Sequence, residues 1–202
     1  MRNIKILSNI LLYCIIPITL IKYYKFYPIL FIILLILILR DWLIISKHNK
    51  EICYFGFVYI IPFYSWLPIL YLRNYEILWI FTICWSYDLF SYIGTKLFKN
   101  KKYFDVIIGF IMSCIISYIY IYYLLQHYMW NSFVHHIVVT PFLIISTILG
   151  KFIYSKVRKV LNKQKSILYD SFILDRFDGF ILTMHIHTVY IFISSHFGGY
   201  KM

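Results

Sequence analysis

Seven long apolar stretches follow one another along this chain, and they constrain its fold more than any other feature. They cover residues 6–21, 27–45, 52–71, 77–98, 104–125, 132–154 and 180–195. Each approaches the ~20 residues that a helix needs to cross the hydrocarbon core of a bilayer. Lipid offers the backbone no hydrogen-bond partner, so we expect these stretches to be helices. The sequence therefore predicts an all-α, polytopic transmembrane bundle of about seven helices.

Composition leaves little room for anything else in the chain. Of its 202 residues, 62% are hydrophobic and only 14% are charged, which excludes the soluble globular classes. We therefore expect residues 1–202 to form a single integral membrane domain without a separate soluble part. Pro62 and Pro68 should interrupt the third stretch, and Pro141 should bend the sixth.

Basic residues outnumber acidic ones by 20 to 8, and their distribution predicts an orientation. If the N-terminus is cytoplasmic and the chain crosses seven times, 16 Lys and Arg residues fall inside and four outside. This asymmetry explains the positive charge without nucleic acid as a partner. The longest polar segment, a loop at about 150–179, is then cytoplasmic and carries seven basic residues and three aspartates.

Asp88 is the clearest candidate for function inside an apolar stretch. A carboxylate in a membrane helix costs roughly 2.5–3.5 kcal/mol on insertion scales, so it should face the bundle interior or a wet cavity. Gly94, further along the same stretch, would allow another backbone to approach closely. The structural alternative for Asp88 is a hydrogen bond or an ion pair with Lys96.

Two further groups of polar residues lie in the 150–179 segment. Asp175 and Asp178, in Asp-Arg-Phe-Asp, are spaced so that together they could bind a divalent cation, and Arg176 between them could bind phosphate oxygens. The structural alternative is that an aspartate caps the start of a helix. The basic run from Lys156 to Lys165 suits phosphates, but it suits a solvated, orientation-determining face better. The remaining polar groups point to structural roles, because the histidine pairs lack a carboxylate partner and the cysteines are isolated: His135, His136, His185, His187, Cys14, Cys53, Cys84 and Cys114.

Taken in order, these segments resemble the bacterial phosphatidate cytidylyltransferases, also called CDP-diacylglycerol synthases. The family's W-x-x-D-x-x-A-Y-x-x-G-R resembles the segment from Trp85 to Lys96, and its K-K-T-W-E-G resembles the segment from Lys101 to Val106. The family's C-terminal signature, G-D-x-x-E-S-x-x-K-R followed by D-R-x-D, is matched at Gly150, Ser155, Arg158, Lys159, Asp175, Arg176, Asp178 and Gly179. The resemblance covers about residues 36–195.

The sequence also departs from the family at positions that matter. Lys151 stands where the family has the metal-binding aspartate of G-D, and Tyr154 replaces the glutamate of E-S. A protonated lysine cannot ligate magnesium. Either Asp170 supplies the missing ligand, or activity is reduced or lost.

The resemblance implies an enzyme that transfers the cytidylyl group of CTP to phosphatidic acid in a bacterial inner membrane. The N-terminus and the signature loop would be cytoplasmic. It implies Asp175, Asp178 and Asp88 as catalytic residues, and Asp175 and Asp170 as ligands of Mg²⁺, with a second cation left open. The implied substrate-binding residues are Lys102, Arg158, Lys159, Arg176 and Ser155. A homodimer stays open, and the alternatives are a catalytically impaired homologue or a small membrane transporter.

Overall fold

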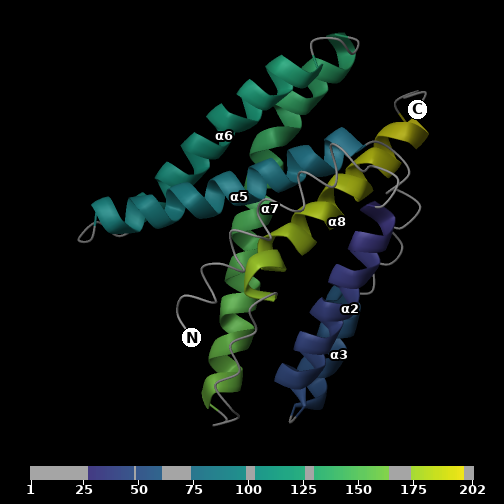
Figure 1. Ribbon diagram of the computed structural model, residues 1–202, viewed down its shortest axis with the longest axis vertical. Helices are drawn as coiled ribbons and strands as arrows, with labels where there is room; N and C mark the ends of the chain where they lie inside the picture. The colour runs from purple at the N-terminus through teal and green to yellow at the C-terminus, as the bar shows by residue number, and fades with distance from the viewer. Residues whose placement is uncertain are drawn as a thin grey trace. The chain divides into compact units, whose positions relative to one another are not determined.

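The computed structural model describes residues 27–47, 49–60, 74–98, 103–125, 130–163 and 174–197. These residues are almost entirely helical and contain no strand, so the predicted all-α class is confirmed for them (Figure 1). The helices are α2 (Tyr27–Ser46), α3 (Lys50–Ile60), α5 (Asn74–Leu97), α6 (Phe104–Leu125), α7 (Trp130–Lys163) and α8 (Leu174–Phe197).

Within the described residues, three helical segments are long and apolar enough to cross a membrane. They are Glu76–Leu97 of α5, Phe104–Tyr123 of α6 and His136–Val160 of α7. They support the membrane-spanning character that the sequence predicts. The predicted span at 6–21 lies outside the described residues, as do Pro62 and Pro68. The number of seven spans therefore stays a prediction.

The segment at 150–179 differs from the predicted loop. Helix α7 continues through Gly150 to Lys163, and α8 begins at Leu174, before its apolar stretch. Lysine, arginine, leucine and valine without an intervening proline can continue a helix whatever their hydropathy. Aspartates are also favourable in the first turn of a helix, where backbone N–H groups lack partners. Residues 164–173 lie outside the described part of the chain.

The chain divides into two compact units, and the first contains α2 and α3. The Asn49 side chain accepts a hydrogen bond from the backbone N–H of Ile52 (3.1 Å) and so caps α3. The Trp42 indole donates to the carbonyl of Ile52 (3.2 Å). A β-carbon at Gly56 would overlap this indole, so only glycine lets α3 pack against Trp42. These contacts fix α2 and α3 as a hairpin.

The second unit comprises residues 79–155 and 178–202 and contains most of α5, α6, α7 and α8. Phe81 of α5 and Phe180 of α8 stack in its core, with ring centroids 4.2 Å apart. Helices α5 and α6 approach closely, because a β-carbon at Gly94 would lie 2.9 Å from the α-carbon of Asp105. The predicted role of Gly94 in admitting another backbone is confirmed.

Many serine and threonine hydroxyls of the described residues donate a hydrogen bond to a backbone carbonyl of their own helix. Each of the following donates to the carbonyl four residues earlier, at 2.6–3.3 Å: Ser46, Thr95, Ser113, Thr140, Ser146, Thr147, Thr183 and Thr188. This bond hides a polar group that lipid could not solvate. Pro141 cannot donate to the carbonyl of Ile137 because it has no N–H. The Tyr118 hydroxyl of α6 donates to that carbonyl instead, at 3.5 Å.

Candidate functional site

Two glycines, Gly150 of α7 and Gly179 of α8, bring these helices close together. A β-carbon at Gly150 would lie 2.7 Å from the carbonyl oxygen of Asp178, and one at Gly179 would lie 2.8 Å from the Thr147 methyl group. Both are closer than β-carbons normally come to other heavy atoms. The glycines therefore set the spacing of the two backbones, and they place Lys151 and Asp178 on facing turns.

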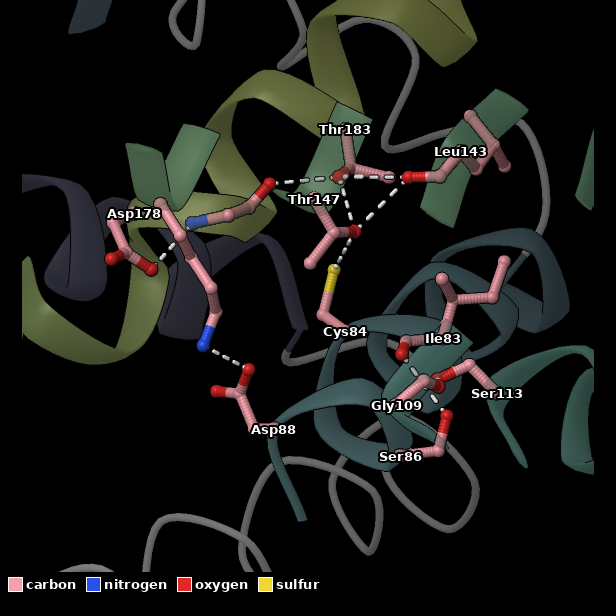
Figure 2. A network of polar contacts seen from close by, with 12 residues as sticks. Ile83, Cys84, Ser86, Asp88, Gly109, Ser113, Leu143, Thr147, Asp178 and Thr183 are labelled. Atoms are coloured by element: carbon pink, nitrogen blue, oxygen red, sulfur yellow. Dashed lines mark hydrogen bonds and ion pairs between the residues drawn. The ribbon is translucent and has the colours of Figure 1, made fainter. Parts of the chain in front are cut away.

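Lys151 of α7 forms an ion pair with Asp88 of α5 (Figure 2). The side chains are 30% and 11% exposed, so the pair is largely withdrawn from the surface. The Lys151 ammonium also lies 5.5 Å from the centroid of the Tyr87 ring, within cation–π range. The predicted alternative pairing of Asp88 with Lys96 is not the one formed, since Lys96 lies over the Tyr92 ring at 5.6 Å.

Asp178 supplies a second carboxylate to the same cluster. It is 7% exposed, and its Oδ1 accepts a hydrogen bond from the N–H of Gly179 (2.6 Å). Its charge acts on Lys151, as does that of Asp88. Asp178 is the fifth residue of α8, beyond its first turn, so it is not the N-cap that the alternative interpretation requires.

A group of small polar side chains, which sequence reasoning did not single out, lies next to the charges. Thr147 of α7 lies 2.8 Å from the Thr183 hydroxyl of α8 and 3.4 Å from the Cys84 sulfur of α5 (Figure 2). Cys84 is buried and reduced, as predicted. Thr147 precedes Lys151 by four residues, and Thr183 follows Gly179 by four. This spacing along one helix face was the available signal.

The histidines belong to a separate aromatic cluster around Trp79. The ring centroids of His136 and His187 lie 4.5 and 5.6 Å from that of Trp79. The Trp79 indole donates to the Ser117 hydroxyl (2.7 Å), which lies 3.2 Å from that of Thr140. Trp79, His136 and His187 are all buried. Their contacts fit the structural role expected from the sequence.

The structure brings Asp88 and Asp178 together, but it does not describe every predicted site residue. Ser155 and Lys159 are exposed on α7, and Arg158 is half-buried there. Asp175 and Arg176 lie in the first turn of α8, and their side chains are outside the described part of the structure. Lys102 and Asp170 are wholly outside it.

The described side chains do not fit the magnesium site that the resemblance implies. Among them, no group of three or more His, Cys, Asp and Glu residues is arranged to hold a metal ion. The expected carboxylate after Gly150 is replaced by the ammonium of Lys151, which lies against Asp88. An ammonium has donors only and repels a cation. The side chains of Asp170 and Asp175, the ligands that the resemblance implies, lie outside the described part of the structure.

Replacing Gly150 by alanine should destabilise the second unit by about 1–3 kcal/mol. The new methyl group would meet the backbone of Asp178 and Gly179, which cannot rotate away. Unfolding of the detergent-solubilised protein, followed by circular dichroism, measures the effect. Ser155→Ala, at an exposed position of the same helix, is the control, because it gains helix propensity without meeting a buried neighbour. Equal stabilities of the two variants would contradict this packing.

Comparisons with protein-family models, curated proteins and solved structures found no match to this chain.

Proposed function

We propose that this chain is a phospholipid-synthesis protein of the phosphatidate cytidylyltransferase type, with seven spans in a bacterial inner membrane and a cytoplasmic N-terminus. One observation supports this most. Asp88, Gly150 and Asp178 come from three separate helices and belong to three separate motifs of the resemblance, and they lie at one place. A chance likeness in motif order would not require its residues to meet.

The proposed reaction joins CTP and phosphatidic acid. A phosphate oxygen of phosphatidic acid attacks the α-phosphorus of CTP, the bond from that phosphorus to the bridging oxygen breaks, and pyrophosphate leaves. The product is CDP-diacylglycerol. Such transfers depend mainly on positioning the reactants and neutralising their charge. The acyl chains would remain in lipid, beside the apolar surfaces of the helices.

Roles in this reaction follow from the chemistry of the side chains. Arg158 and Lys159, near the end of α7, offer donors for phosphate oxygens, as would Lys102 and Arg176. Asp88 and Asp178 would support Asp175, and Lys151 would neutralise part of their charge. Asp175, with Asp170, is the proposed site for Mg²⁺, which would supply charge neutralisation for the triphosphate when bound.

The test is conversion of labelled CTP and phosphatidic acid by the purified protein in the presence of magnesium. We expect formation of CDP-diacylglycerol with release of pyrophosphate, and its loss in Asp178→Asn. Glu51→Gln, in the exposed first turn of α3, is the matched control and should keep wild-type turnover. Wild-type turnover no higher than that of Asp178→Asn would refute the proposed activity.

The ion pair between Lys151 and Asp88 favours a second candidate, a homologue that binds the substrates without turning them over. This protein would retain CTP or phosphatidic acid in equilibrium dialysis while forming no product. Loss of that binding in Arg158→Gln would assign it to the α7 cations. Product formation by the wild type would exclude this candidate.

A further inference from the structure

The cluster around Lys151 combines three charged groups carried by three helices. Asp88 extends from α5, Lys151 from α7 and Asp178 from α8. Asp88 is in direct contact with the ammonium, and Asp178, which accepts a hydrogen bond from the N–H of Gly179, is near enough to add to the negative charge around it. Two carboxylates that share an apolar site repel each other and are costly to ionise unless a cation lies with them. The Lys151 ammonium meets that requirement.

Lys151 is held along its whole length, unlike a surface lysine. Its γ-carbon lies 3.5 Å from the position that a β-carbon on Gly179 would take, so the aliphatic stem runs over the glycine. Its ammonium pairs with Asp88 and lies over the Tyr87 ring. A β-carbon at 179 would lie in ordinary van der Waals contact with the stem. The site is therefore built to receive this side chain.

We propose that Lys151 is a tethered cation that takes the place of a metal ion beside Asp88, in a site to which Asp178 adds a second negative charge. Metal sites commonly neutralise clustered carboxylates with a divalent cation. Here a covalently attached ammonium does so, and it also repels any cation that approaches. This part of the site is therefore independent of divalent metal. Lys151 acts through the carboxylates and is a positioning residue.

The proposal predicts that a metal site can be restored by one substitution. Lys151→Asp removes the ammonium and adds a third carboxylate beside Asp88 and Asp178. With Mn²⁺ alone as the probe, we expect the dissociation constant of the purified protein to fall at least about tenfold, since two unit charges change close to the ion. Electron paramagnetic resonance of free Mn²⁺ measures it without substrate.

Two controls separate restored ligation from a change in overall charge. Lys151→Met removes the ammonium but adds no ligand, so its gain in Mn²⁺ affinity should be smaller than that of Lys151→Asp. Adding Asp88→Asn to Lys151→Asp should abolish the gain. Equal Mn²⁺ affinities of Lys151→Asp and the wild type would overturn the proposal.

If Lys151→Asp does not fold, the wild type still provides a test. The wild type and the single variant Asp88→Asn should bind Mn²⁺ with the same affinity. Both are measured at a temperature at which both are folded. A tenfold weakening by Asp88→Asn would show that Asp88 ligates metal despite Lys151, and the proposal would be wrong. None of these measurements involves cytidylyl transfer, so their failure and the failure of the proposed function are distinguishable.

Discussion

Asp88→Asn should lower the free energy of unfolding by about 3 kcal/mol, because it leaves the Lys151 ammonium without its ion-pair partner inside the helix bundle. Removing one member of a buried pair typically costs about 3–5 kcal/mol. The lower end applies here, since Asp178 still acts on Lys151 and the lysine side chain is 30% exposed. Equilibrium unfolding by sodium dodecyl sulfate in mixed micelles measures the loss.

A double-mutant cycle with Lys151→Met tests the cause of this loss. Methionine keeps much of the length of the lysine stem but carries no charge, so the double variant should lose less stability than the two single variants added together. We expect a coupling energy of about 0.5–3 kcal/mol, as is usual for residues in direct contact. Additive losses would mean that the two side chains are independently important and that their ion pair contributes nothing.

Trp79→Ala should have a loss of similar size, about 3 kcal/mol, for a different reason. The indole is fully buried, and its removal would open a cavity between α5, α7 and α8 beside His136 and His187. Large-to-small substitutions of this kind cost about 3–5 kcal/mol in soluble proteins. The lower end is expected here because lipid, unlike water, does not oppose the exposure of apolar groups. The same unfolding experiment applies.

Trp79→Phe separates packing from hydrogen bonding at this position. Phenylalanine keeps an aromatic ring but loses the N–H that donates to Ser117. Interhelical hydrogen bonds in membranes average about 0.6 kcal/mol, so this variant should lose much less than Trp79→Ala. A loss in Trp79→Phe as large as that in Trp79→Ala would assign the stability to the hydrogen bond instead of the cavity.

The bounds of a helix could be predicted from the sequence where the apolar stretch and the helix begin and end at the same residues. The predicted span at 104–125 coincides with α6, whose start follows a polar, basic segment. Helix α7 extends nine residues beyond its predicted end at 154, because residues such as Arg158 favour helix without favouring lipid. The start of α8 was likewise missed, since Asp175 lowers hydropathy while stabilising a helix N-terminus.

The candidate site was predictable in part. The cost of placing a charge among apolar residues identified Asp88 from the sequence, and helix-start chemistry identified Asp178. The partnership of Asp88 with Lys151 could not be predicted, because it depends on which helix faces pack together, and Lys96 was nearer along the chain. Thr147, Thr183 and Trp79 gave no signal of comparable strength, since none of them carries a charge whose burial needs explanation.

The hydroxyls bonded within their own helices have a consequence for biosynthesis. A helix whose serines and threonines are already satisfied can enter the bilayer before any neighbour has been made. Asp88 differs from these hydroxyls, because its ion-pair partner Lys151 is on α7. Newly inserted α5 therefore lacks this ion pair until α6 and most of α7 have left the ribosome. The pair can form only when α7 packs against α5, so it joins helices that are made at different times.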